Sequence, residues 1–255
     1  MRPALYLKWG IFLKILPFTL LFCAVKWGIH FQGLEIWRFD LLTGSLFGAA
    51  TFVIAFILSG TLADYRTSEE LVCQFASAIE SIQDTALFAA ANHPVYDPQP
   101  LTQGLSRILE RLLGWLNHGD APLNITLAID DLNPLFARLE PHISGPIISR
   151  IQGEQGRLRF LVARMKLIRE TEFLAPAYVL LQIFLAGAIL ALLLTSGDLL
   201  SKTVVVSGFL FTSFVYLVML IHDLDNPFQY DGKSYVDIDL AIFDELLARL
   251  QGSLR

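Results

Sequence analysis

Apolar residues cluster in four long blocks along the chain, and this pattern predicts four membrane-spanning helices. Three of the blocks, at residues 41–62, 173–197 and 203–221, contain no Asp, Glu, Lys or Arg. A helix rises about 1.5 Å per residue and needs about 20 apolar residues to cross a hydrocarbon core about 30 Å thick. Each of these three blocks is long enough, or nearly so, to span a membrane.

The first block, at residues 10–25, is shorter and contains Lys14. The sequence Lys-Trp-Gly-Ile occurs twice, at residues 8–11 where the block begins and at residues 26–29 just after its end. Trp and Lys prefer the membrane interface, and a lysine within a span can extend its ammonium group to the headgroups. We interpret the block as a retained first span with Lys8 and Lys26 as interfacial anchors, because it lacks a signal-peptide cleavage pattern.

Short connections pair the spans into two hairpins. Roughly fifteen residues separate the first two spans and about five separate the last two, so each pair is expected to be antiparallel. The chain then divides into an N-terminal hairpin at 1–62, a polar helical domain at 63–172, a second hairpin at 173–222 and a C-terminal segment at 223–255. The expected fold class is an all-α membrane protein.

Basic residues indicate the orientation of the spans. Both termini and the polar domain share one side of the membrane, and the basic residues there are Arg2, Lys8, Lys14, Arg157, Arg159, Arg164, Lys166 and Arg169. The opposite side has Lys26, Arg38 and Lys202. Because cytoplasmic flanks carry the excess of Lys and Arg, we expect the termini and the polar domain in the cytoplasm.

Within the polar domain the second span is expected to continue as a helix over 63–91, until the proline-rich run at 92–100 ends it. A helix at 101–116, a short helix around Leu135 and a basic helix at 147–172 follow. The C-terminal residues 236–250 form an amphipathic pattern, with an apolar stripe of Ile238, Ile242, Leu246 and Leu250. That stripe needs a partner, either in the polar domain or in a neighbouring subunit.

Composition excludes several classes of function. The chain is 54% apolar and 17% charged, with a net charge of −5, which argues against nucleic acid as a partner because phosphate binding needs a basic field. Cys23 and Cys73 have neither disulfide nor metal-ligand spacing. The sequence contains no nucleophile elbow, phosphate loop or His-Glu-x-x-His motif. We therefore expect neither an enzyme nor a cofactor.

Histidine and aspartate side chains do not form an obvious metal site. His93, His118 and His142 each adjoin Pro or Gly and are interpreted as surface loop residues. His222, Asp223 and Asp225 at the end of the last span have ligand-type side chains. A polar helix end at the interface explains them more simply, although a metal-dependent membrane enzyme is an alternative.

The second span carries two patterns that leave their function open. It is rich in Gly, Ala and Ser, which allow close helix packing, either within one subunit or in a ring of identical helices. Ala50, Ile54 and Leu58 form an apolar strip about 12 Å long, which is typical of ordinary core. Arg66 has two possible roles. It pairs with Glu69 or Glu70, one helical turn away, on an exposed helix surface, or it attracts anions to the mouth of a pore.

Three short motifs resemble the bestrophin superfamily of anion channels, and more closely its bacterial members. The basic, Leu-Pro-containing start at residues 10–17 is similar to the start of bacterial bestrophins. Tyr65, Arg66 and Glu69 resemble the Tyr, Arg and Glu that follow the family's second span. The turn formed by Asp225, Asn226, Pro227 and Phe228 is similar to the family's Asn/Asp-Pro-Phe turn after span four.

The resemblance implies a homo-oligomer in the lipid bilayer of a bacterial-type inner membrane, a pentamer with five copies of span two around a pore for inorganic anions such as chloride. Aligning Arg66 with the family arginine implies that Ala50, Ile54 and Leu58 form the pore neck and that Arg66 attracts ions at its mouth. Ala50 is smaller than the Phe often found at the family's second neck residues. Residues 229–233 lack the acidic run of calcium-gated members. A non-conducting scaffold or regulator of the same fold is the alternative function.

Overall fold

The computed structural model describes residues 4–170, 175–197, 200–230 and 234–253. Arg2 and the side chain of Lys8, both used in the charge pattern, lie outside the described residues, as does the start of the predicted span at 173–197. The chain forms two compact units, one of residues 1–65 with 172–226 and the other of residues 66–171 with 227–255. We call them the membrane unit and the polar unit.

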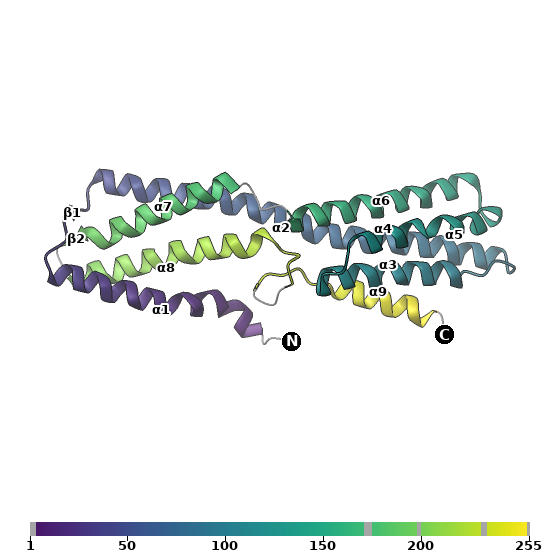
Figure 1. The fold of residues 1–255 in the computed structure, drawn as a ribbon, viewed down its shortest axis with the longest axis horizontal. Coiled ribbons are helices and arrows are strands. Elements are labelled where there is room, and N and C mark those ends of the chain that lie inside the picture. The colour runs from purple at the N-terminus through teal and green to yellow at the C-terminus, as the bar shows by residue number, and fades with distance from the viewer. Residues whose placement is uncertain (1–3, 171–174, 198–199, 231–233, 254–255) are drawn as a thin grey trace. The chain divides into compact units, whose positions relative to one another are not determined.

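The membrane unit contains the four predicted spans (Figure 1). Its helices are α1 (Ala4–Phe31), the first part of α2 (Leu41–Asn92), α7 (Ala175–Leu194) and α8 (Leu200–Asp225). Each contains a stretch long and apolar enough to cross a membrane. The predicted all-α membrane fold is therefore confirmed. Two unpredicted strands of two residues each, β1 (Trp37–Arg38) and β2 (Thr195–Ser196), pair in parallel.

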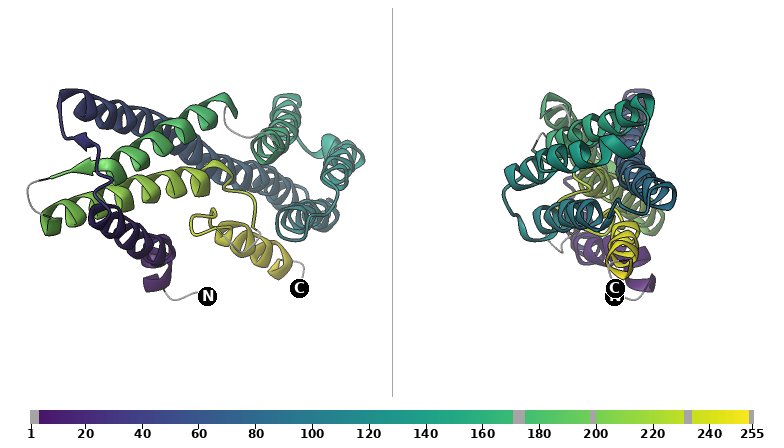
Figure 2. Two further views of the ribbon diagram at one scale, coloured as in Figure 1. Left: turned by 60° about the vertical axis from the view of Figure 1, so that its left-hand side comes forward. Right: turned by 90° about the vertical axis from the view of Figure 1, so that its right-hand side faces the viewer.

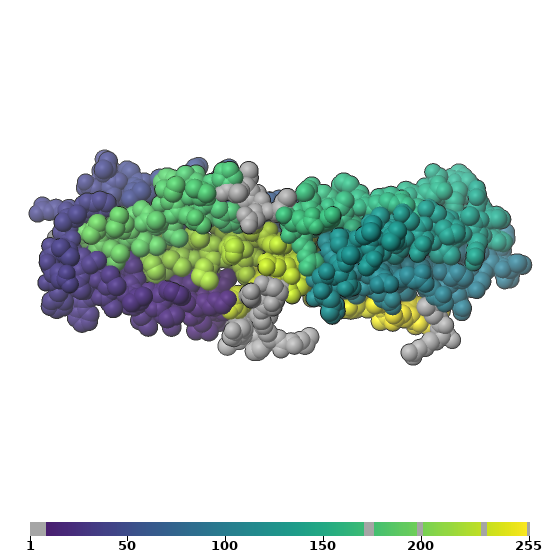
Figure 3. Space-filling model, viewed as in Figure 1, coloured from purple at the N-terminus to yellow at the C-terminus, as the bar shows by residue number. Residues whose placement is uncertain are grey.

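Helices α1 and α8 make the most extensive contact in the membrane unit, and both also contact α7; the ribbons of α7 and α8 lie side by side (Figure 2). A Cβ atom added at Gly208 would lie 2.8 Å from the Sγ of Cys23, so a larger residue there would require the Cys23 side chain to move. The hydroxyls of Thr19 and Thr212 hydrogen-bond at 2.8 Å. The surfaces of the two helices meet along the membrane unit (Figure 3).

The prediction that Lys26 anchors α1 at the interface is wrong, because its side chain is 0% exposed. Its Nζ lies 2.9 Å from Oε1 of Glu35. It also donates hydrogen bonds to the carbonyl oxygens of Leu193, at 3.0 Å, and Thr195. An ammonium group has three donors: the two carbonyls accept two of them, and the Glu35 carboxylate lies within ion-pair distance of the charge. The ammonium charge of Lys26 also offsets the partial negative charge that the helix dipole places at the C-terminal end of α7.

Glu35 joins this cluster from the connection between the first two spans. Its Oε2 lies 2.9 Å from Nδ1 of His30, and its side chain is only 10% exposed. Burial raises the pKa of Glu35, but hydrogen bonds from Lys26 and His30 outweigh burial and hold that pKa below its usual value. The carboxylate is therefore charged at neutral pH and pairs with Lys26.

The second part of α2 lies in the polar unit, with α3 (Gln99–His118), α4 (Leu123–Asp130), α5 (Leu132–Leu139), the 3-10 turn η1 (Glu140–His142), α6 (Gly145–Glu170) and α9 (Ala241–Gly252). A buried hydrogen bond of 3.0 Å from the Thr102 hydroxyl to Oε1 of Gln83 joins α3 to α2. Helix α4 lies between the predicted helix at 101–116 and the one around Leu135, where no helix was predicted. Ile125 and Ile129 on α4 are fully buried, so tertiary packing stabilises this short helix.

The amphipathic C-terminal helix starts later than predicted. The backbone N–H of Ala241 donates to Oδ1 of Asp239 at 2.9 Å, and helix α9 begins there rather than at residue 236. Phe243 is buried, whereas Ile242, part of the predicted stripe, is 36% exposed. The Phe243 ring packs edge-on against Phe75 of α2, with centroids 5.7 Å apart. The partner of this helix is therefore the polar unit of the same chain.

Replacing Lys26 by Met keeps most of the side-chain volume but leaves the buried Glu35 carboxylate without its main partner. We expect a loss of about 3–5 kcal/mol in unfolding free energy, because removal of one partner leaves an uncompensated charge. Thermal unfolding in detergent measures the effect. Lys202→Met, at an exposed lysine, is the control and should change little. Equal stability of the two variants would show that the cluster contributes nothing.

Truncating Phe243 to Ala should destabilise the polar unit by about 3–5 kcal/mol, because the change opens a cavity in its core. The neighbouring Ile242→Ala variant removes an apolar side chain of α9 from a partly exposed position and should cost much less. Denaturant unfolding followed by circular dichroism compares the two. A larger effect at Ile242 would contradict the observed helix register.

Candidate functional site

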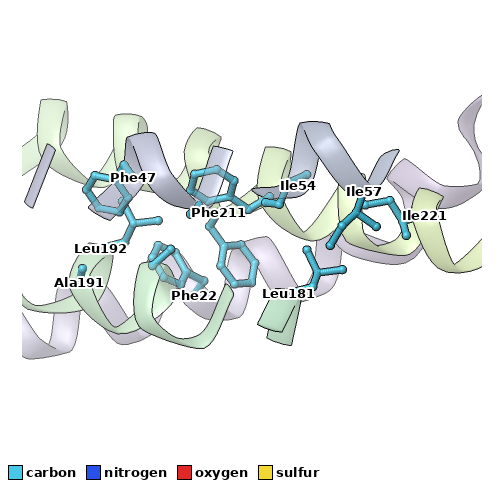
Figure 4. Close-up of a cluster of buried hydrophobic side chains, with 12 residues drawn as sticks. Phe22, Phe47, Ile54, Ile57, Leu181, Ala191, Leu192, Phe211 and Ile221 are labelled. Atoms are coloured by element: carbon cyan, nitrogen blue, oxygen red, sulfur yellow. The ribbon is translucent and has the colours of Figure 1, made fainter. Parts of the chain in front are cut away.

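One face of α2 is buried inside the membrane unit. Ala50 is 0% exposed, Ile54 1% and Ile57 4%. Together with Phe22, Phe47, Leu181, Phe211 and Ile221 they belong to one hydrophobic cluster (Figure 4). Leu58 is partly buried and packs against the same cluster. The strip of Ala50, Ile54 and Leu58 thus contributes to the core of a single chain.

In the single chain Ala50 and Ile54 are therefore not on a free surface, as the pore-neck role implied by the resemblance to bestrophins would require. A side chain that lines a pore on an oligomer axis has to be exposed in one isolated subunit. Ile54 instead points into the cluster near Phe211 (Figure 4). The four-residue spacing was observed correctly, but it lies on the face of α2 that the other spans cover.

The opposite side of α2 is exposed and has a distinct composition. Phe52 and Phe56 are 71% and 73% exposed, and their rings stack with centroids 6.5 Å apart. Between Ser45 and Ser59 the other exposed residues of this face are small or carry a hydroxyl, whereas Leu41 and Leu62 are exposed beyond this stretch. With the two Phe residues, the small and hydroxyl-bearing ones form what we call the open face: Ser45, Gly48, Phe52, Ala55, Phe56 and Ser59. Among the described residues, the Ser59 hydroxyl has no hydrogen-bond partner.

Exposed positions on the other three spans are occupied mainly by large apolar side chains. Examples are Phe18 and Leu20 on α1, Ile183 on α7, and Phe209 on α8. Large apolar side chains suit contact with lipid, whereas small and hydroxyl-bearing residues suit contact with another helix or with water. The open face of α2 is therefore the candidate functional site of the membrane unit.

Arg66 follows this segment of α2 and is the first residue of the polar unit. Its side chain is exposed, as are those of Glu69 and Glu70. Within the described part of the chain, Arg66 forms no ion pair with either glutamate, so the exposed helix pair considered from the sequence is not formed. The guanidinium charge of Arg66 is therefore available to ions in solution.

The predicted turn after span four lies where α8 ends, at Asp225. Pro227 and Phe228 are buried, Phe228 completely. The carbonyl of Pro227 accepts a hydrogen bond from the N–H of Ile238 at 3.2 Å. The turn thus directs the chain from Asn226 toward α9. Among the described residues, no group of three or more His, Cys, Asp or Glu side chains could hold a metal ion, and this includes the cluster at His222.

No protein-family model matches the chain, and no curated protein matches it. Solved structures do match. A bacterial bestrophin homolog from Klebsiella pneumoniae with a single mutation aligns at a TM-score of 0.76 and 15% identity, covering 95% of this chain and 98% of that one. Another mutant of the Klebsiella pneumoniae homolog has a TM-score of 0.73 at 18% identity, covering 94% and 99%.

A crystal structure described as a membrane protein aligns at a TM-score of 0.77 and 15% identity, covering 94% of this chain and 98% of that one. These matches span nearly the whole chain, so the resemblance to bestrophins predicted from the sequence is confirmed for the fold. The chain has the fold of a bestrophin-like integral membrane protein.

Cysteine accessibility tests the assignment of the open face. In a Cys23→Ala and Cys73→Ser background, a membrane-impermeant thiol reagent should modify Ala55→Cys and Ser59→Cys in reconstituted protein, because these positions would contact water. Ile54→Cys, in the core, and Ile183→Cys, at an exposed position on α7, should remain unmodified. If Ala55→Cys is as unreactive as Ile183→Cys, the open face contacts lipid or another helix instead of water.

Proposed function

We propose that this chain forms a homo-oligomeric anion channel, a pentamer, whose pore is lined by the open face of α2. The observation that carries the proposal is the composition of that face. Apart from Phe52 and Phe56 its residues are small or carry a hydroxyl, whereas the other spans expose mainly large apolar side chains. The bestrophin fold supports it, because the sequence resemblance implies five copies of span two around a pore.

The constriction of this pore is assigned to Phe52 and Phe56. Rings of apolar side chains restrict ion flow because water leaves a narrow apolar passage. We assign this role to the two Phe residues in place of Ala50, Ile54 and Leu58, since Phe52 and Phe56 are strongly exposed in one subunit. The stacking of Phe52 on Phe56 supports a constriction that extends over one turn of the helix.

Arg66 is assigned to the attraction of anions. An exposed guanidinium that forms no ion pair among the described residues produces a positive potential, and several copies around an axis would add to it. The excess of Lys and Arg on the side of the termini supports a cytoplasmic location for the polar unit and a bacterial-type inner membrane as the site of the channel.

Reconstitution into liposomes, combined with native mass measurement in detergent, tests the proposal. We expect a pentamer that passes chloride or nitrate. Phe52→Ala and Phe56→Ala should increase flux, because they widen the constriction. Arg66→Glu should reduce the preference for anions over cations, by about tenfold if the charge acts within a Debye length of about 10 Å of the ion path. Arg111→Glu makes the same charge change at an exposed position of α3 and should have little effect.

Two outcomes would overturn the channel. The first is a monomer in the native mass measurement, because a monomer has no axial pore. An oligomer that passes no anions under several gradients and pH values would instead support a non-conducting scaffold of the same fold, and copurification of a stoichiometric second protein would strengthen that alternative.

A further inference from the structure

Two histidines that are far apart in the sequence meet in the polar unit. His93 directly follows the last residue of α2, and His142 is the last residue of η1. The centroids of their rings are 5.6 Å apart, with the ring planes tilted by 50°. The sequence analysis treated both as separate surface loop residues, because their proximity depends on how the polar unit folds. His118, which was grouped with them, is not part of this pair.

The pair lies in an open groove of about 580 Å³. His93 is exposed and His142 is half-buried. Asn92 and Ser144 contribute polar side chains to the groove lining, and Phe88 and Ile143 contribute apolar ones. Among the described residues, neither imidazole has a hydrogen-bond or ion-pair partner. Their ring nitrogens are therefore available to a ligand from solution.

The surrounding backbone holds the pair in place. The N–H of His93 donates to the carbonyl of Ala89 at 2.8 Å, and the N–H of Tyr96 donates to the carbonyl of His93 at 2.9 Å. The ring of Tyr96 packs against His142, with centroids 5.4 Å apart. Burial, followed by the charge of Asp97, raises the pKa of Tyr96. Its hydroxyl is protonated at neutral pH, so Tyr96 supports the His142 ring rather than adding an anionic ligand.

We propose that His93 and His142 bind a divalent transition-metal ion of the zinc class. Zinc lies about 2.0–2.1 Å from a histidine nitrogen, hence roughly 3.2 Å from the ring centre. With one nitrogen of each ring turned toward a shared point at that distance, a centroid separation of 5.6 Å corresponds to an angle of about 120° at the metal, near the tetrahedral value. The remaining coordination positions open into the groove, where water completes the shell. Rotation of the exposed His93 ring brings its nitrogen toward the metal.

The chemistry of the donors selects the class of metal. Imidazole suits Zn²⁺, Ni²⁺, Cu²⁺ and Co²⁺, whereas Ca²⁺ and Mg²⁺ require oxygen ligands, mainly carboxylates. The described lining of the groove contains no carboxylate and no thiolate. A bound metal would link the end of α2 to the turn before α6. Because protons compete with a metal for imidazole nitrogen, binding should weaken on acidification.

Metal titration of the full-length protein tests this site. The protein is purified in detergent without a polyhistidine tag and stripped with a chelator. Zn²⁺ binding is then measured by calorimetry, and Co²⁺ binding by its absorption spectrum. We expect one metal ion per chain. His93→Ala and His142→Ala should each weaken binding by about tenfold or more, since even loss of a residue that only orients a ligand costs 10–100-fold.

His118→Ala is the matched control, because it removes an exposed histidine of the same unit and should leave the affinity unchanged. Circular dichroism and gel filtration check that each variant is folded. The proposal is overturned if the stripped wild-type protein binds no Zn²⁺, if only one of the two variants loses affinity, or if the His118 variant loses as much. The readout does not depend on ion conduction, so the site and the channel succeed or fail separately.

Discussion

The whole structure has to accommodate α2, a single helix of 52 residues. A helix satisfies its own backbone hydrogen bonds, which is what allows one segment to lie in hydrocarbon and then continue into a polar unit without interruption. Its side chains must then meet different demands in the two units. In the membrane unit one face supplies Ala50 and Ile54 to the core, and in the polar unit Phe75 and Ile79 do the same. The open face is a part of α2 that the single chain leaves exposed.

The end of the membrane unit where α1 and α7 end is organised by charge rather than by apolar packing. Lys26 reaches from α1 to the end of α7, and Glu35 returns from the following connection to neutralise it. In a low-dielectric environment such a charge is tolerated only when its partners are in place. The parallel pairing of β1 with β2 places the adjacent backbones side by side at the same end. The cluster thus fixes the position of α1 relative to α7, because ion pairs and hydrogen bonds require particular distances and directions. Apolar contacts do not have this requirement.

Much of the fold could be predicted from the sequence, because hydropathy and helix periodicity are local. The four spans, the continuation of α2 and the break near Pro94 all follow from such patterns. Interactions between distant residues could not be predicted in this way. Lys26 was taken for an interfacial anchor because nothing near it in the sequence indicates that Glu35 folds back. Three of the four residues of the predicted α9 stripe, Ile238, Leu246 and Leu250, are buried, but the start of the helix was placed at residue 236 rather than Ala241. The apolar repeat begins at Ile238, before the helix does. His93 and His142 looked like unrelated loop residues because they are far apart in the sequence.

The candidate site shows why spacing alone cannot identify a pore surface. A repeat of four residues stays near one face of a helix for several turns, whichever face it is. Ala50, Ile54 and Leu58 satisfy that spacing, and so do Gly48, Phe52 and Phe56. Only the positions of α1, α7 and α8 distinguish the two sets, because these helices cover one and leave the other exposed. The resemblance to bestrophins directed attention to this helix, and the exposure of Phe52 and Phe56 is the reason the proposed ion path is assigned to their face of it.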